Sequence, residues 1–205
     1  MSLIQPEEEK KPSFEPISQS GEFKNQIKDF IWETIKIVVI SLAIIIPIRH
    51  FLIQPFYVKG ASMEPNFYDH EYLIVDEISY RLDSPKRGDV VVFRYPNDPS
   101  QFFIKRIIGL PGETIDIKNG EITISNPIHR EGFKLNESLY LPATHTQGNH
   151  HIKLTEDEYY VLGDNRSSSL DSRVFGPIKR SDIIGRTWLR GWPLDRIKVF
   201  NDQIY

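Results

Sequence analysis

Residues 113–125 read ETIDIKNGEITIS, and this stretch decides the fold class of the chain. Apolar and polar residues alternate on both sides of Asn119-Gly120, a pair that favours the tight turn of a two-residue β-hairpin. Further short runs rich in Val, Ile, Phe and Tyr occupy residues 71–78, 89–95, 101–108, 158–162 and 182–190. These runs lack helical periodicity, and Gly and Pro separate them. The sequence therefore predicts a mainly β fold, with an antiparallel β domain over residues 55–200.

A polar segment interrupts the predicted domain at about residues 126–155. It lacks the alternation of the neighbouring runs, so we expect a long loop or a variable insertion. His145, His150 and His151 lie in it without a regular ligand spacing. We therefore expect a solvated loop here, and neither a metal nor a cofactor.

The N-terminal part has a different composition. Residues 1–28 contain three prolines and the charge run EEEKK, which predicts a flexible tail. Residues 37–48 are twelve in a row without a charge. As a helix they cover about 18 Å, short of the roughly 30 Å hydrocarbon core of a bilayer, but apolar flanking residues lengthen the stretch. We expect one transmembrane helix over residues 29–54.

Two other interpretations of the apolar stretch are a buried core helix and the centre of a cleavable signal peptide. The interrupting charges Glu33, Lys36 and Arg49 lie toward its ends, where long cationic side chains reach the lipid headgroups. No Ala-x-Ala site follows the stretch, which argues against a cleavable signal peptide. The flanking charges are balanced and do not indicate an orientation.

The composition excludes several kinds of chemistry. The 205 residues include no cysteine, which removes disulfides, thiolate metal sites and a cysteine nucleophile. Lys and Arg number 25 against 28 Asp and Glu, a net charge of -3, so we expect no nucleic-acid partner. A nucleophile in this chain has to come from another residue type.

A candidate nucleophile is Ser62, which lies in the sequence GASMEP at residues 60–65. The alternative is a serine that only caps or stabilises a turn. A serine hydroxyl needs a base to become a nucleophile, and histidine is the usual one. His70 is near Ser62 in the sequence, which makes it a candidate base with no further support.

Lys105 is a stronger candidate for the base. It lies in FFIKRII at residues 102–108, where strand alternation places it on one face with Phe103 and Ile107. Burial disfavours the ammonium form and lowers the pKa of a lysine, so a buried Lys105 could accept a serine proton near neutral pH. The alternative is an edge-strand lysine whose ammonium group reaches water.

A polar cluster occupies residues 163–173, which read GDNRSSSLDSR. It combines two acids, two arginines and four serines. Pairs of arginine and carboxylate could brace a site and orient the hydroxyl groups around it. The alternative is a solvated polar loop.

In combination, these motifs resemble those of the type I signal peptidases, membrane-bound serine proteases that remove signal peptides from exported proteins. The motifs follow the family's order: SMEP at 62–65, RGDVVVF at 87–93, KRIIGLPG at 105–112 and GDNR at 163–166, continuing to residue 173. The resemblance covers roughly residues 30–190. It implies the largely antiparallel β fold of this family, without a metal or an organic cofactor.

The resemblance also implies roles for individual residues. Ser62 is then the nucleophile, whose backbone N–H is one oxyanion donor, and Lys105 is the general base. Gly60 stands where some members supply a second donor from a serine hydroxyl, so that donor is not identified. The implied supporting residues are Ser169, which orients the lysine, the bracing pair Asp171 and Arg173, and the structural residues Asp164 and Arg166.

Partners and location follow from the same resemblance. The family cleaves after small residues, commonly Ala-x-Ala, through an acyl-enzyme. The implied partners are exported preproteins, the lipid bilayer and the translocation machinery. The tail would lie in the cytosol and the catalytic domain on the extracytoplasmic side of the cell membrane.

Two other functions fit parts of the sequence. Self-cleaving repressors share a Ser-Lys dyad on a related β fold, but they carry an N-terminal DNA-binding domain where this chain has a tail and an apolar stretch. A membrane-anchored β domain that binds partners without turnover fits the architecture, but it gives no reason for Ser62 and Lys105.

Overall fold

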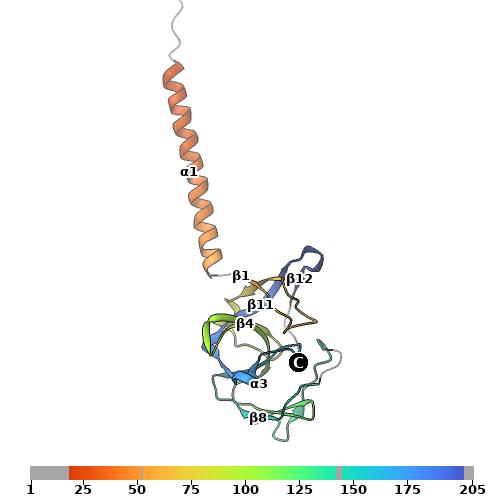
Figure 1. Ribbon diagram of the computed structural model, residues 1–205. Coiled ribbons are helices and arrows are strands. Elements are labelled where there is room, and N and C mark those ends of the chain that lie inside the picture. The colour runs from red at the N-terminus through yellow and green to blue at the C-terminus, as the bar shows by residue number, and fades with distance from the viewer. Residues whose placement is uncertain (1–18, 52, 142–144, 201–205) are drawn as a thin grey trace, which may run out of the picture. The chain divides into compact units, whose positions relative to one another are not determined.

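The structure is a computed structural model that describes residues 19–51, 53–141 and 145–200. The chain divides into two units, Met1–Ile46 and Pro47–Tyr205, and each is described by itself. The first unit contains most of one long helix, and the second is the β domain (Figure 1).

The long helix α1 comprises Gln19–Phe51, so it begins well before the expected boundary at residue 29. The prediction of a flexible tail is wrong for residues 19–28, because no proline lies between Pro16 and Pro47 to stop a helix there. Residues 1–18, the rest of the expected tail, lie outside the described residues. The expected transmembrane helix over residues 29–54 is not confirmed. Within the described part of the chain, no helix combines the length and the apolar character needed to cross a membrane, and Ile53 already belongs to the strand β1 (Ile53–Tyr57).

The larger sheet of the β domain has eight strands, in the order β1-β2-β11-β3-β4-β9-β10, with β12 paired to β11. Every pair in it is antiparallel, as the sequence predicted. The strands are β1 (Ile53–Tyr57), β2 (Tyr72–Asp76), β3 (Val90–Tyr95), β4 (Asp98–Gly109), β9 (Glu158–Leu162), β10 (Ile178–Lys179), β11 (Ile183–Trp192) and β12 (Lys198–Val199).

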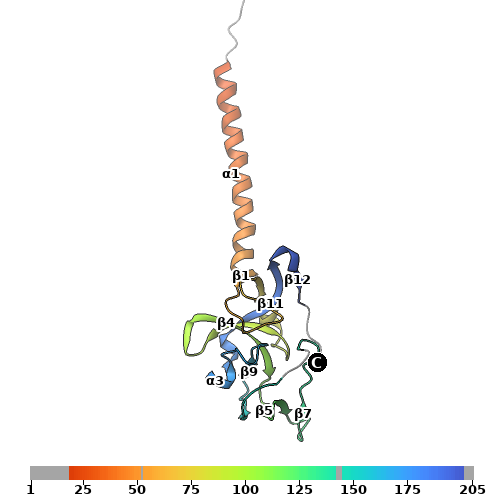
Figure 2. The ribbon, with the colours of Figure 1, turned by 45° about the vertical axis from the view of Figure 1, so that its right-hand side comes forward.

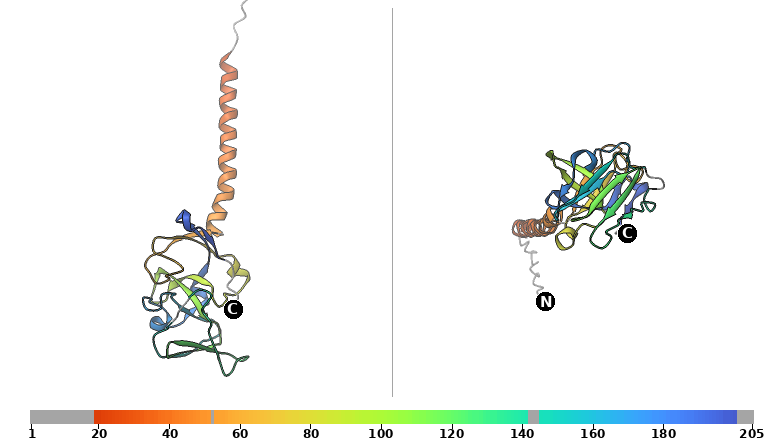
Figure 3. Two further views of the ribbon diagram at one scale, coloured as in Figure 1. Left: turned by 90° about the vertical axis from the view of Figure 1, so that its right-hand side faces the viewer. Right: turned by 90° about the horizontal axis from the view of Figure 1, so that it is seen from below.

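The smaller sheet has four strands in the order β7-β6-β5-β8. Figure 2 labels two of them, β5 and β7, at the lower end of the domain. The predicted hairpin forms its centre, with β5 (Thr114–Lys118) paired to β6 (Glu121–Ser125). Asn119 and Gly120 both have positive φ, 54° and 85°, which the tight hairpin turn requires. Figure 3 shows the two sheets from two further directions.

The segment 126–155 is only partly a loop, so that prediction is wrong for two short stretches. β7 (Phe133–Lys134) extends the sheet from β6, and β8 (His150–Lys153) pairs with β5. Ile152 of β8 packs against the apolar cluster beneath the hairpin. Strands this short carry too few alternating residues to stand out in the sequence.

Four short helical turns connect the strands. They are α2 (Ser79–Leu82), α3 (Ser172–Phe175) and the 3-10 turns η1 (Arg180–Asp182) and η2 (Leu194–Arg196). Asp171 caps α3 by accepting a hydrogen bond from the backbone N–H of Arg173. This cap begins to order the polar cluster at residues 163–173.

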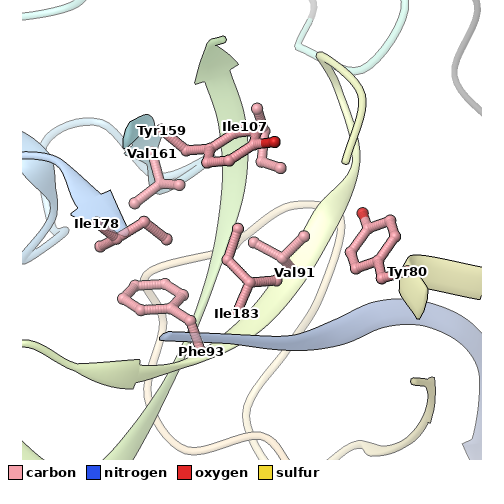
Figure 4. Close-up of a cluster of buried hydrophobic side chains, with 8 residues drawn as sticks. All are labelled: Tyr80, Val91, Phe93, Ile107, Tyr159, Val161, Ile178 and Ile183. Atoms are coloured by element: carbon pink, nitrogen blue, oxygen red, sulfur yellow. The ribbon is translucent and has the colours of Figure 1, made fainter. Parts of the chain in front are cut away.

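Three apolar clusters form the core, and β4 contributes to or borders all of them. Ile107 belongs to the first cluster and Ile108 to the second, while Ile104 packs against the third. Phe103 also packs against the first cluster, as expected for the face that carries Lys105. Figure 4 shows the buried members of this cluster, Tyr80, Val91, Phe93, Ile107, Tyr159, Val161, Ile178 and Ile183. Burial on both faces fixes the register of β4 and therefore the direction of Lys105.

Candidate active site

Ser62 lies in the turn between β1 and β2, and its neighbour Met63 anchors that turn. Met63 is buried in the third apolar cluster beside Phe67 and Leu73. The backbone N–H of Phe67 donates to the carbonyl of Met63 at 2.9 Å, which closes a helical turn after the serine. An apolar side chain next to Ser62 thus fixes the backbone of the serine, while Ser62 itself stays half-buried.

The structure brings Lys105 and Ser62 together, although 43 positions separate them in the sequence. Lys105 Nζ lies 2.8 Å from Ser62 Oγ, and it donates a second hydrogen bond to the Ile104 carbonyl, also at 2.8 Å. Lys105 is 4% exposed, and its Nζ stands 5.3 Å from the centre of the Phe103 ring. The side chain is therefore held in one direction in an apolar setting.

Burial lowers the pKa of Lys105 to about 8, although the negative charges of Asp171 and Asp164 act in the opposite direction. Near pH 8 the amine is therefore neutral in about half of the molecules. A neutral amine has a lone pair that can accept the Ser62 proton, and it still has N–H groups for the Ile104 carbonyl. The pair has the geometry and the protonation needed for a nucleophile and its base.

The loop at residues 163–166 holds the backbone of Ser62 from the other side. The backbone N–H of Asn165 donates to the Ser62 carbonyl at 3.1 Å, and its side-chain amide donates to the Ala61 carbonyl at 3.1 Å. Gly163 packs so closely that a Cβ there would lie 2.5 Å from the Ser62 carbonyl oxygen. Asn165 is a site residue that the sequence does not single out, apart from its place between Asp164 and Arg166.

Asp164 does not touch Lys105 but binds the next residue along β4. Its carboxylate accepts two hydrogen bonds from Arg106, at 2.8 and 2.6 Å, and one from the Asn66 side chain at 2.8 Å. The Arg106 guanidinium also stacks 3.9 Å from the centre of the Tyr140 ring. This fully buried pair links β4 to the loop at 163–166.

Asp171 and Arg173 form the second buried pair of the cluster. Arg173 donates from Nε and from a terminal nitrogen to the two Asp171 oxygens, both at 2.8 Å. Burial alone would raise the pKa of the Asp171 carboxyl, but the bonds and charge of Arg173 keep it below its usual value. The carboxylate also accepts the backbone N–H of Gly163 at 3.1 Å. Asp171 thus fixes the residue that packs against Ser62.

Ser169 does not make the contact expected of it. Its Oγ is buried and makes no hydrogen bond to Lys105 or to any other described residue, although it is near enough to Asp171 to help lower the pKa of that carboxyl. The Lys105 amine instead uses the Ile104 carbonyl, which lies on its own strand and needs no movement of a loop.

Two histidines, His70 and His151, are each paired with an aspartate and not with Ser62. His70 is exposed and pairs with Asp69, with 2.9 Å between Nδ1 and the carboxylate oxygen. His151, in β8, pairs in the same way with Asp116 at 2.6 Å. Among the described residues, no group of three potential ligands is placed to hold a metal ion. Lys105, and neither of these two histidines, lies within hydrogen-bond distance of the Ser62 hydroxyl.

The oxyanion donors are only partly identified. The Ser62 backbone N–H makes no hydrogen bond within the described residues, so it is free to donate to a ligand. The Gly60 N–H is already bonded to Asp69 Oδ1 at 2.8 Å. Gly60 therefore offers neither a hydroxyl nor its backbone N–H as the second donor.

A cavity of about 300 Å³ opens beside Ser62 and Lys105. Its walls come mainly from β1, from β4 and from the turn after β1, and most of the lining is apolar. The lining residues beyond the dyad are Phe56, Tyr57, Val58, Lys59, Leu73, Val92, Gln101, Phe102, Phe103, Ile104 and Leu170.

The chain is similar in sequence to known proteins. Residues 31–192 match the family described as signal peptidase, peptidase S26. The chain is 35% identical over 174 residues to the probable signal peptidase I-2 of Synechocystis sp. strain PCC 6803, covering 82% of this chain and 76% of that protein. It is 36% identical over 177 residues to the signal peptidase I P of Bacillus subtilis subsp. natto, covering 83% and 94%. A crystal structure of a signal peptidase I from Enterococcus faecalis V583 is 28% identical, covers 51% of this chain and 97% of that one, and has a TM-score of 0.42.

The close packing of Gly163 leads to a first prediction. A methyl group at position 163 in Gly163→Ala would lie 2.5 Å from the Ser62 carbonyl oxygen and 2.1 Å from Ser169 Oγ, so the Ser62 backbone and the Ser169 side chain both have to move. We expect any reaction that depends on Ser62 to slow by about 100-fold, since displacements near 1 Å have effects of this size. Acylation of Ser62 by a serine-directed reagent measures this rate.

Gly191→Ala is the matched control, because a Cβ at Gly191 meets nothing within 4 Å. Circular dichroism establishes that both variants are folded. Equal acylation rates for the parent and a folded Gly163→Ala variant would contradict the role of this contact.

Proposed function

We propose that the chain cleaves signal peptides with Ser62 as nucleophile and Lys105 as general base. The chain belongs to the signal peptidase family, peptidase S26, whose type I members are serine endopeptidases. The observation that carries the proposal is the 2.8 Å separation between Lys105 Nζ and Ser62 Oγ. The buried setting of the amine supports it further, because burial favours the neutral form that a base needs.

The reaction follows from these two groups. Neutral Lys105 accepts the Ser62 proton as Oγ attacks the carbonyl of the scissile bond, and it then donates this proton to the leaving amine. The acyl group stays on Ser62 as an ester. Lys105, neutral again, accepts a proton from the water that hydrolyses this ester. The free Ser62 backbone N–H stabilises the oxyanion in both steps.

The substrate proposed for this site is the extended end of a signal peptide with small residues before the cleaved bond. β1 is the edge of the larger sheet, and residues 102–105 of β4 pair only with β3. Both backbone edges border the cavity beside the dyad. An extended peptide adds a strand to such an edge and directs alternate side chains into the apolar lining. This arrangement supports cleavage after Ala-x-Ala in exported preproteins.

The self-cleaving repressor has less support. Its DNA-binding domain would precede the dyad, whereas this chain has α1 there, and the family match begins within that helix at residue 31. A β domain that binds partners without turnover does not account for a buried lysine directed at a serine hydroxyl. Cleavage of a preprotein separates these functions.

The dyad is tested by incubating the full chain in detergent with a preprotein that carries an Ala-x-Ala site. We expect Ser62→Ala and Lys105→Ala to reduce cleavage by about 10³-fold or more, since each removes one half of a unit that acts together. Ser84→Ala and Lys118→Ala are the matched controls, because both residues are exposed and lie outside the site. Cleavage that persists in either dyad variant would refute the assignment.

The pH dependence tests the state of the lysine. Because Lys105 has a pKa of about 8 and acts as the neutral amine, we expect kcat/KM to rise with pH and to reach half its maximum near pH 8. Below this value the rate falls about tenfold for each pH unit, as the ammonium form accumulates. A rate that stays constant between pH 6 and 9 would exclude a lysine base with this pKa.

We also propose that α1 anchors the chain in the cell membrane, with the β domain on the extracytoplasmic side. The described side chains of α1 between residues 37 and 46 are all exposed, including Ile37, Ile40 and Ile44, and none of them is charged. In the β domain, Trp188 and Trp192 are exposed as well, and tryptophan favours the interface between membrane and water. The lipid bilayer is the partner that suits these surfaces, and the translocation machinery would deliver the substrate there.

Flotation with phospholipid vesicles tests this anchor. We expect the full chain to float with the vesicles in 1 M salt, because apolar burial is not screened by ions. The double variant Ile40→Lys, Ile44→Lys should stay at the bottom of the gradient. Leu82→Lys is the control, since Leu82 is a highly exposed leucine of the β domain. A parent chain that does not float, or a double variant that floats equally well, would contradict the anchor.

A further inference from the structure

We propose that Glu137, in the segment 126–155, is a positioning residue for Ser62 that acts through Arg166. This inference rests on the proposed function, because Ser62 has to be the nucleophile for its position to matter. It also gives the segment 126–155 a role that its sequence does not indicate.

The first contact is the buried ion pair between Glu137 and Arg166. Arg166 donates to both Glu137 oxygens, one of them at 2.8 Å, and the two side chains are 4–5% exposed. Tyr140 donates its hydroxyl to the same carboxylate, and Arg166 also donates to Thr146. Glu137, Tyr140 and Thr146 all belong to the segment 126–155, so two residues of the segment bind the guanidinium directly and a third binds Glu137.

The second contact joins Arg166 to the loop that holds the serine. Arg166 Nε donates to the Gly163 carbonyl at 3.0 Å, and the Arg166 carbonyl accepts a hydrogen bond from Arg173 at 2.7 Å. Arg166 is therefore bonded to Gly163, at the other end of the loop at 163–166, and to Arg173, which follows the loop. The residue next to it, Asn165, donates its backbone N–H to the Ser62 carbonyl.

These contacts form a continuous path from Glu137 to the nucleophile. If Glu137 loses its charge, a buried guanidinium remains without its counter-charge, which is strongly unfavourable in a site closed to water. Arg166 then moves toward water or toward another acceptor, and the Gly163 carbonyl and the Asn165 amide move with it. Ser62 loses the hydrogen bond that sets the direction of its backbone.

The consequence falls on the chemical step and not on substrate binding. The walls of the cavity come from β1, β4, the turn after β1, β2, β3 and Leu170, and Glu137 and Arg166 do not line it. A displaced Ser62 lowers kcat, while the surface that binds the peptide keeps its shape and KM stays unchanged. A residue that only stabilised the fold would lower the melting temperature without changing kcat per folded molecule.

The test compares Glu137→Gln with Glu137→Asp and with the control Glu121→Gln in the full chain. Glu121 makes an ion pair with Lys134 of the same segment, but that pair is largely exposed. We expect Glu137→Gln to lower kcat per acylatable Ser62 by about tenfold or more at unchanged KM, as for a small displacement of a reacting group. Glu137→Asp keeps the charge and should recover part of kcat, and Glu121→Gln should match the parent.

Hydrogen exchange at the Asn165 amide gives a readout besides activity. We expect this amide to exchange faster in Glu137→Gln and to be unchanged in Glu121→Gln. If Glu137→Gln does not fold, the test uses Glu137→Asp alone. We then expect a kcat below that of the parent, by less than tenfold, and exchange at the Asn165 amide that is faster than in the parent.

The outcomes separate this inference from the proposed function. A parent that cleaves preproteins, with Glu137 variants that keep both kcat and slow exchange at Asn165, would overturn the positioning role and leave the dyad intact. A parent without cleavage would overturn the proposed function, while fast exchange in Glu137→Gln would still support the path to Ser62. A loss that appears only in KM would also contradict the inference.

Discussion

The desolvation of one amine is the constraint on which the rest of the structure depends. Burial brings the pKa of Lys105 from 10.5 to about 8, which corresponds to roughly 3 kcal/mol of differential free energy. The unfolded chain keeps its lysine protonated up to about pH 10.5, whereas the folded chain loses the proton above pH 8. This contribution therefore destabilises the fold fully below pH 8, and it fades as the pH rises toward 10.5. The apolar clusters on both faces of β4 have to offset it.

The acids around the lysine follow from the same constraint. Asp164 and Asp171 both raise the pKa of Lys105, and two unpaired carboxylates would restore the ammonium form that burial disfavours. Each carboxylate is instead bonded to an arginine, Asp164 to Arg106 and Asp171 to Arg173. The two carboxylates therefore hold loops in place through their ion pairs. The positive charges of the arginines reduce the rise in the Lys105 pKa that the carboxylates cause. Isolated acids at these positions would oppose a neutral base.

The sequence predicted those parts of the structure that depend on local patterns. The hairpin at Asn119-Gly120, the antiparallel strands and the face of β4 that carries Lys105 all follow from alternation and turn chemistry. Four features did not follow: the early start of α1, the two short strands of segment 126–155, the Asn165 bond to Ser62, and the bond that Ser169 fails to make. The early start of α1 reflects the absence of proline between Pro16 and Pro47. The other three depend on contacts between distant residues or on strands too short to show a periodic pattern. Strand alternation made Lys105 a candidate base for Ser62, and the family resemblance implied the same pair. No local pattern joins residues 43 positions apart, so the contact between them could not be predicted from alternation alone.

The site combines two opposite requirements. The Lys105 amine has to be shielded from water, whereas the Ser62 hydroxyl has to be accessible to a substrate. A strand satisfies the first, since β4 is packed on both faces and leaves the amine 4% exposed. A strand cannot satisfy the second in the same way, because its neighbours would cover the hydroxyl. Ser62 therefore lies in a turn, and a turn has no ladder of hydrogen bonds to fix it. Buried Met63 on one side and the loop at 163–166 on the other replace that ladder. That loop is irregular too, so the buried ion pairs in and around it supply the rigidity that regular structure gives to Lys105.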